Sequence, residues 1–255
     1  FAAAALTAAS GAHAYAIFTG IDSDGSESTQ STIVNSGAAE TSFKAGLVGV
    51  GTQNFEGYSV GSNAAAVSPI SFGAAGNATL AGAGSVQGNT LGATNGVGRY
   101  SVPGGERFWE TDAGNGNFEI TFSNTLAAFG FYGIDMGDFA GTLKLELYNA
   151  GNALVSTQDI TTVRTGGSIL YYGLIAANAS EEFKRVRFVS TAGSGDFFAF
   201  DNFTVGTYCQ ITAIDCGTTP PDGGGGGGGT VPEPATLALV AAGLGGLRLT
   251  QRRRA

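Results

Sequence analysis

The sequence has very little of the chemistry that most enzymes use. It contains one histidine, two cysteines, one methionine and one tryptophan among 255 residues. The histidine, His13, lies near the start of the chain, in a segment that we expect to be removed. The remaining chain then has no imidazole to act as a general base or zinc ligand, which argues against Ser-His-Asp, Cys-His and common zinc chemistry.

Charged residues are also scarce, at 13% of the chain. The formal net charge is −8, although four arginines lie close to the C-terminus, so the body of the protein is more acidic than the whole. Binding to a phosphate backbone requires a basic surface. Nucleic acid is therefore not an expected partner.

Glycine, by contrast, is abundant, with 43 residues. Glycine in a helix interior costs about 1 kcal/mol relative to alanine, whereas turns between short strands accept it. Apolar and polar residues alternate in several segments, and two further segments are apolar on both faces, as in central strands. These segments are residues 118–122, 143–148 and 186–189, and residues 128–134 and 197–200. The pattern predicts an all-β protein, a β-sandwich of jelly-roll type.

One helix is predicted near the N-terminus. Between residues 29 and 50, apolar side chains recur at three- to four-residue intervals or their multiples, at Ile33, Ala39, Phe43 and Leu47. This spacing places them on one face of an amphipathic helix.

Composition divides the chain into four parts. Residues 1–14 are alanine-rich and end in Ala-His-Ala, a small-x-small cleavage site that predicts the remnant of a signal peptide whose start lies upstream. Residues 15–207 form the predicted β-sandwich domain. Residues 208–230 form a linker that holds both cysteines and seven consecutive glycines. Residues 231–255 form a separate C-terminal signal.

That C-terminal signal has three ordered elements: Val-Pro-Glu-Pro at residues 231–234, an apolar segment at residues 235–247, and an arginine cluster at residues 252–254. Thirteen helical residues span about 20 Å, against roughly 30 Å of hydrocarbon in a bilayer. We therefore expect a short C-terminal transmembrane helix that serves as a transient signal rather than a permanent anchor.

These elements resemble the PEP-CTERM sorting signal of exported bacterial proteins. The resemblance implies that an exosortase-type processing enzyme recognises Pro232, Glu233 and Pro234. It also implies that the basic cluster holds the C-terminus at the cytoplasmic face of the inner membrane; this cluster is Arg252, Arg253 and Arg254. The expected destination is the cell surface or extracellular matrix of a Gram-negative-type bacterium, in association with exopolysaccharide.

The body resembles jelly-roll carbohydrate-binding modules in two segments, residues 55–57 (Phe-Glu-Gly) and residues 198–203 (Phe-Ala-Phe-Asp-Asn-Phe). In those modules an early glutamate and a late aspartate help to hold a structural Ca²⁺ ion, which prefers oxygen ligands. The resemblance implies Glu56 and Asp201 as calcium ligands, with Asp196 as a further candidate. A simple surface or hydrogen-bonding role for these carboxylates remains the alternative.

Two other features suggest sites. Trp109 is a candidate for stacking on a sugar ring, although the adjacent Phe108 favours a place in the core. Cys209 and Cys216 enclose a six-residue loop, and in an exported protein a disulfide between them is favoured over free thiols or a metal site.

The sequence therefore predicts an exported, non-catalytic surface or matrix protein. One alternative is a carbohydrate-binding module with a defined sugar site. Another is a small glycoside hydrolase, which needs two carboxyl groups across a cleft; the acids considered for it are Glu110, Glu119 and Glu146. Glu119 and Glu146 occupy polar positions of alternating strands, where solvated charge is the ordinary explanation.

Overall fold

The computed structural model describes residues 15–112, 117–136, 142–160, 165–191, 195, 197–212 and 214. Thirteen strands, two α-helices and three 3₁₀ turns lie within these ranges. In chain order they are β1 (Ala16–Asp22), α1 (Asn35–Ala45), β2 (Gly51–Gln53), α2 (Ala64–Val67), β3 (Ile70–Ser71), η1 (Gly73–Ala75), β4 (Asn77–Ala81), β5 (Ser85–Gly88), β6 (Arg107–Asp112), β7 (Asn117–Leu126), β8 (Ala128–Ile134), β9 (Leu143–Tyr148), β10 (Leu154–Ile160), β11 (Ile169–Ile175), η2 (Ala179–Glu181), β12 (Phe183–Ser190), β13 (Phe197–Gly206) and η3 (Tyr208–Gln210).

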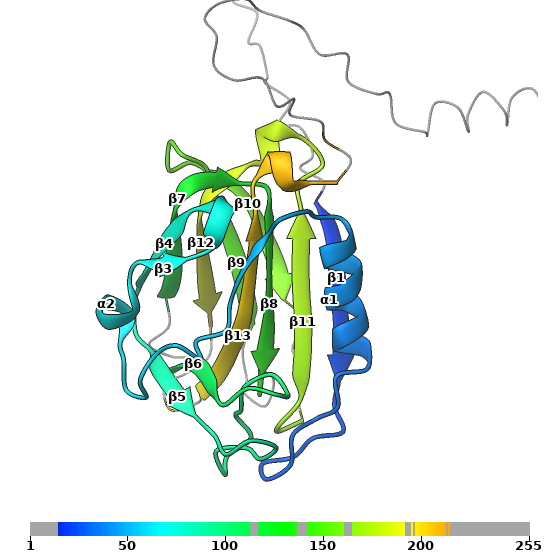
Figure 1. The fold of residues 1–255 in the computed structure, drawn as a ribbon, viewed down its shortest axis with the longest axis vertical. Coiled ribbons are helices and arrows are strands. Elements are labelled where there is room, and N and C mark those ends of the chain that lie inside the picture. The colour runs from blue at the N-terminus through cyan, green and yellow to red at the C-terminus, as the bar shows by residue number, and fades with distance from the viewer. Residues whose placement is uncertain are drawn as a thin grey trace, which may run out of the picture. The chain divides into compact units, whose positions relative to one another are not determined.

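The strands form two antiparallel sheets, which confirms the predicted all-β class (Figure 1). The first sheet has the order β1-β11-β8-β13-β6-β5, and β2 pairs with β13 beside this path. The second sheet has the order β10-β9-β12-β7-β4-β3. Because the chain crosses between the sheets from β7 to β8, β8 to β9 and β10 to β11, neighbouring strands often come from distant parts of the sequence.

The main core lies between the two sheets and is rich in phenylalanine. Phe188 from the second sheet packs against Phe200 and Phe131 from the first, with ring centroids 4.5 and 5.1 Å apart. These side chains come from the segments whose alternation or continuous apolarity predicted strands. Aromatic rings at such separations favour tilted and edge-to-face contacts, which add to the free energy gained by burial.

A second apolar cluster covers the other face of the first sheet. It joins Phe43 of α1 to Tyr132 and Tyr171 of the sheet, and it includes Tyr100 and Val102 from residues 89–106. We call residues 89–106 the connector, because they link β5 to β6. Figure 1 shows α1 lying alongside β1. The first sheet is therefore covered on both faces, by the second sheet on one and by α1 and the connector on the other.

The predicted helix is present but shorter than residues 29–50. It begins at Asn35, where Asp22 at the end of β1 accepts hydrogen bonds from the backbone amides of Asn35 and Ser36 at 2.9 Å. This carboxylate satisfies amides that the first turn of a helix leaves without partners. Ala39 and Phe43 are buried as predicted, whereas Ile33 lies before the helix and is exposed.

Three long strands were not predicted: β1, β10 and β11. The jelly-roll assignment stays a prediction. Among the residues that the structure describes, none of the helices is both long and apolar enough to cross a bilayer. The predicted membrane segment, residues 235–247, lies outside the described residues.

Phe43 is the side chain that attaches α1 to the sheet, with its ring 5.8 Å from those of Phe18 and Tyr171. Because Phe43 is fully buried, Phe43→Ala should lower the free energy of unfolding by about 3–5 kcal/mol. Urea denaturation followed by circular dichroism measures the loss. Val48→Ala, at a position that is 52% exposed, is the control and should change stability by less than about 0.5 kcal/mol. Equal losses in the two variants would contradict this packing.

Candidate functional site

A polar pocket of about 270 Å³ lies where the connector crosses the first sheet. Its walls come from three separate parts of the chain: the turn after β2, the connector and the middle of β13. The lining residues are Asn54, Glu56, Ser101, Val102, Pro103, Gly104, Gly105, Asp201 and Asn202. The structure thus brings together Glu56 and Asp201, which lie far apart in the sequence.

Asp201 forms the floor of the pocket and is 1% exposed. Its Oδ2 accepts hydrogen bonds from the Ser101 hydroxyl and the Val102 amide, both at 2.8 Å. Its Oδ1 accepts the amide of Asn202 at 2.7 Å. The carboxylate therefore fastens the connector to β13, since both Oδ2 partners belong to the connector.

Glu56 forms the opposite wall and is exposed. Its Oε1 accepts the backbone amides of Glu106 and Arg107 at 2.7 and 2.9 Å. The Ser101 hydroxyl lies 3.5 Å from the same oxygen and so stands between the two carboxylates. A Cβ atom on Gly105 would lie 2.5 Å from Glu56 Oε1, so a larger residue at this position would displace the Glu56 carboxylate.

The backbone beside each carboxylate is in the left-handed region. Phe55, which precedes Glu56, has φ of 59°, and Asn202, which follows Asp201, has φ of 48°. The β13–β8 register shifts between Asp201 and Thr204, so a bulge interrupts the strand next to the buried acid. Such conformations cost about 1–3 kcal/mol each for residues other than glycine and cluster at functional sites. For the bulky Phe55 the conformation is especially unusual.

The electrostatics of the pocket follow from this burial. Removal from water disfavours the charged form and raises the pKa of Asp201 to about 7, and the negative charge of Glu56 acts in the same direction. The hydrogen bonds from Val102, Ser101 and Asn202 act in the opposite direction. A cation placed between the two carboxylates would offset the cost of ionising Asp201.

The donor set fits a cation only in part. Within the described ranges, no group of three or more His, Cys, Asp or Glu side chains is placed to hold a metal ion. A Ca²⁺ ion takes six to eight oxygen ligands. Beyond Glu56 and Asp201, the remaining ligands would have to be neutral: the side-chain oxygens of Asn54 and Asn202, backbone carbonyls of the connector and water.

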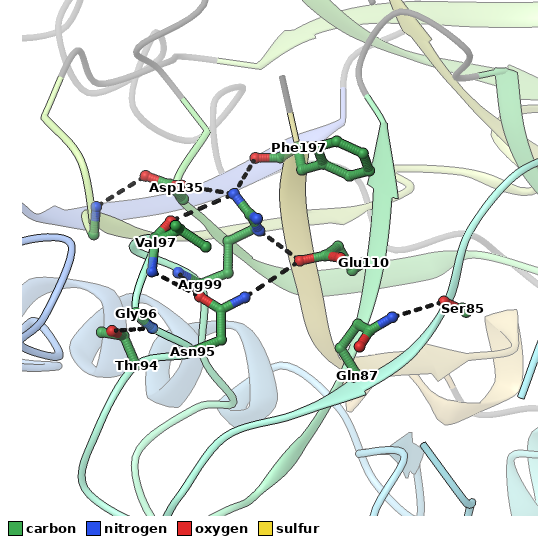
Figure 2. A network of polar contacts seen from close by, with 11 residues as sticks. Ser85, Gln87, Thr94, Asn95, Gly96, Val97, Arg99, Glu110, Asp135 and Phe197 are labelled. Carbon is green, nitrogen blue, oxygen red and sulfur yellow. Dashed lines mark hydrogen bonds and ion pairs between the residues drawn. The ribbon is translucent and has the colours of Figure 1, made fainter. Parts of the chain in front are cut away.

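A partly buried ion-pair network holds the connector just before it reaches the pocket (Figure 2). Arg99 Nε lies 2.5 Å from Glu110 Oε2, and Arg99 Nη1 lies 3.6 Å from Asp135 Oδ2. The guanidinium also stacks over the ring of Phe197, 5.4 Å from its centroid. Because Arg99 is two residues before Ser101, this network holds the connector wall of the pocket although its own residues do not line the pocket.

The sugar-stacking role predicted for Trp109 is corrected by its position. Its side chain is 0% exposed and packs between Phe55 and Phe118, with ring centroids 6.0 and 5.5 Å away. A ligand in solution cannot reach an indole buried between the sheets. Trp109 therefore has the core role that Phe108 favoured, and the turn at Gly84 packs directly onto it, where a Cβ atom would lie 2.6 Å from the ring.

The three acids considered for glycoside hydrolysis do not face one another across this pocket. Glu110 is paired with Arg99. Glu119 Oε2 lies 2.7 Å from Arg185 Nη1, and Glu146 pairs with Arg187 at 3.7 Å, both in the second sheet. These pairs give each carboxylate a structural partner.

Several predicted site residues lie outside the described residues: Asp196, Cys216 and the sorting-motif residues Pro232, Glu233, Pro234, Arg252, Arg253 and Arg254. Cys209 is disulfide-bonded, and the sequence holds only one other cysteine.

Sequence reasoning missed Ser101, Asn54 and Asn202. A signal for Asn202 was present, because the polar pair Asp-Asn interrupts an otherwise apolar strand at residues 197–205. Asparagine is several-fold enriched among residues with positive φ, so this pair marks a bulge. Ser101 gave no comparable signal, since only the folded connector brings its hydroxyl to Asp201.

The C-terminal part of the chain matches a known family model. Residues 230–254 match the model of the PEP-CTERM protein-sorting motif. The chain carries a PEP-CTERM sorting motif. This motif is a signal for export and sorting to the cell envelope or surface in Gram-negative bacteria, and it implies processing by an exosortase. No curated protein matches the chain.

Solved structures similar to this chain are β-sandwich domains of low sequence identity. The K2 cleaved adhesin domain of Lys-gingipain has 13% identity and a TM-score of 0.40, over 60% of this chain and 97% of that chain. The C-terminal family 22 carbohydrate-binding module of Clostridium thermocellum Xyn10B has 19% identity and a TM-score of 0.37, over 67% and 97%. A family 29 carbohydrate-binding module has 15% identity and a TM-score of 0.29, over 53% and 88%.

The raised pKa of Asp201 predicts how stability depends on pH. The folded state holds the proton of this carboxyl up to about pH 7, whereas the unfolded chain releases it near its ordinary value of about 4. The stability that Asp201 contributes is therefore fully present below the pKa of this carboxyl in the unfolded chain. It is lost as pH rises from about 4 to 7, by about 1.4 kcal/mol for each unit between the two pKa values.

Chemical denaturation between pH 3 and pH 8 measures this slope. Asp201→Asn should remove the fall, whatever its effect on stability at a single pH. Asp159→Asn changes a carboxylate whose side chain is 84% exposed, and it should leave the slope as in the natural protein. A natural protein whose stability is constant across this interval would rule out a buried Asp201 with a raised pKa.

Proposed function

We propose that this protein is an exported, non-catalytic protein of the bacterial cell surface or extracellular matrix that binds extracellular polysaccharide. The observation that carries the proposal is the PEP-CTERM motif at residues 230–254. An exosortase-type enzyme recognises this motif at the inner membrane, which the segment engages transiently, and the β-sandwich is the part that acts at the destination.

The pocket at Glu56 and Asp201 is the proposed polysaccharide site. Its accessible wall offers the carboxylate of Glu56 and the amides of Asn54 and Asn202, groups that exchange hydrogen bonds readily with sugar hydroxyls. Its volume lies just below the roughly 300–1,000 Å³ of typical ligand sites, so it suits one small group of a longer chain. Ordered connector amides already fix Glu56, which lowers the entropy lost when a ligand binds.

A non-catalytic role agrees with the chemistry of the described residues. Two carboxyl groups that cleave a glycosidic bond flank it at separations of about 5 to 9.5 Å, and one of them is a proton donor. Glu110 and Glu119 instead form close pairs with Arg99 and Arg185. The buried Asp201 has a raised pKa, but its oxygens all accept hydrogen bonds from the protein itself.

A Ca²⁺ ion between Glu56 and Asp201 is a second proposal for the same pocket. It is supported by the two converging carboxyl groups and by the cost of leaving Asp201 charged without a cation. In this arrangement calcium is a structural ion that fixes the pocket wall.

The sorting proposal predicts the effect of removing residues 231–255. The truncated protein should still be exported through its N-terminal leader, but it should no longer reach the cell surface or matrix in processed form. Fractionation and immunoblotting of the producing bacterium measure this. Glu233→Gln should have a similar effect, while Gln251→Ala, outside the proline-glutamate motif and the arginine cluster, should sort normally. The same destination and the same processed mass in the truncated protein would contradict the proposal.

The binding proposal predicts the effect of Glu56→Gln. On a panel of extracellular polysaccharides, this variant should bind at least tenfold more weakly than the natural protein, because it loses a charge-assisted hydrogen bond of about 1.5–3 kcal/mol. Asp159→Asn is the matched control and should bind normally. Binding to the panel is measured in calcium and in EDTA. Loss of polysaccharide binding in EDTA supports the proposed calcium ion, and equal binding in both would contradict it. A protein that binds no polysaccharide, or a variant that binds as well as the natural one, would overturn the proposed site.

A further inference from the structure

A buried carboxylate, Glu181, lies near the N-terminal end of β1. Glu181 ends the short turn η2 and is 1% exposed. Its Oε2 accepts a hydrogen bond from the backbone amide of Ala177 at 2.7 Å. Glu181 thus folds back onto the end of β11, which pairs with β1 along the edge of the first sheet.

The pairing of β1 with β11 shows where the Glu181 carboxylate lies relative to Tyr15. The β1–β11 ladder begins with the pair Ala16 and Ile175. The next amide, Ala176, points to the β8 side and donates to Ala127 O at 2.7 Å. Ala177 is the next residue, two positions beyond the end of β11.

The amide of Ala177 donates to the Glu181 carboxylate. Continued by one residue, the register sets Tyr15 opposite Ala176. The Glu181 carboxylate is thus bound to the residue that follows the one opposite Tyr15, near the N-terminal end of β1.

The side chain of Tyr15 is held by the same turn. Its hydroxyl donates to the backbone oxygen of Glu181 at 2.6 Å, and its ring packs against the main core. Burial raises the pKa of the Tyr15 phenol, and the negative charge of Glu181 raises it further. The Glu181 charge therefore acts on the Tyr15 phenol.

Tyr15 is also the first residue after the predicted leader cleavage site, which ends at Ala14. Hydrolysis of the peptide bond between them adds the hydroxyl of water to the Ala14 carbonyl carbon and hydrogen to the Tyr15 nitrogen. The new amine is protonated at neutral pH.

We propose that the α-ammonium group released at Tyr15 by export processing forms a buried ion pair with the Glu181 carboxylate. The proposal rests on the proposed export of the protein. The unprocessed chain has an uncharged peptide nitrogen at this position, so the pair belongs to the mature form alone. Processing then stabilises the end of β1, an edge strand of the first sheet.

The pair predicts a second pH dependence, at alkaline pH. An α-amine ordinarily titrates near pH 8, and a neighbouring carboxylate raises the folded-state pKa of the amine. The stability that the pair supplies is fully present below about pH 8 and is lost as pH rises through the raised value. The titratable groups placed beside it are the Tyr15 phenol, which loses its proton only above its ordinary range, and Glu182.

The experiment compares chains that run from Tyr15 to Ala255 and are produced with a free or an acetylated α-amine. Between pH 7 and pH 10, the melting temperature of the free-amine protein should fall by roughly 3 °C more than that of the acetylated protein. Glu181→Gln should remove this difference, and the neighbouring Glu182→Gln should keep it. Acetylation leaves Glu181 in place, so the comparison does not depend on how well a variant folds.

Equal pH profiles for the free and acetylated chains would overturn the proposal. So would an exported product whose N-terminal residue, determined by sequencing, is not Tyr15. Neither result bears on polysaccharide binding or on the C-terminal motif, so this inference and the proposed function fail separately.

Discussion

The hydrogen bonds between Asp201 and the connector are the interaction on which the rest of the structure depends. They fasten residues 89–106 across the first sheet, so that Tyr100 and Val102 complete the second apolar cluster while Ser101 faces the pocket. Burial of this carboxyl group, which is 1% exposed, costs free energy because removal from water disfavours its charged form. A buried acid that adjoins a left-handed residue, Asn202, is more typical of a site than of a structural support alone.

The two faces of the first sheet differ in what they contact. The inner face contributes phenylalanines to the core between the sheets, and this core includes the tryptophan. The outer face is covered by α1 and the connector, and the polar pocket lies where the connector crosses β13. In the proposed function, a ligand contacts the protein at the edge of the connector, where Glu56, Asn54 and Asn202 line the pocket. The PEP-CTERM motif indicates that the chain is exported and sorted to the cell envelope or surface.

The sequence predicted the parts of the fold that have a strong local pattern. Strict alternation identified β7, β9 and β12, and continuous apolarity identified β8 and the start of β13. The strand β1 was missed because its Thr-Gly-Ile-Asp end is also typical of a turn, and pairing with β11 decides between the two. At the site, resemblance paired Glu56 with Asp201, yet local sequence holds no information about Ser101, which reaches them only through the path of the connector. Trp109 shows the same limit, since its burial depends on strands that are distant in the sequence.

Carbon-13 NMR of the carboxyl groups tests the central claim most directly, namely that Glu56 and Asp201 form one ligand-binding pocket. The spectra are recorded at neutral pH before and after addition of calcium and, separately, of the polysaccharide that binds best. The account predicts that the Glu56 and Asp201 resonances respond together to at least one of these ligands, while the exposed Asp159 stays unchanged. Resonances of Glu56 and Asp201 that remain fixed under both additions would contradict it.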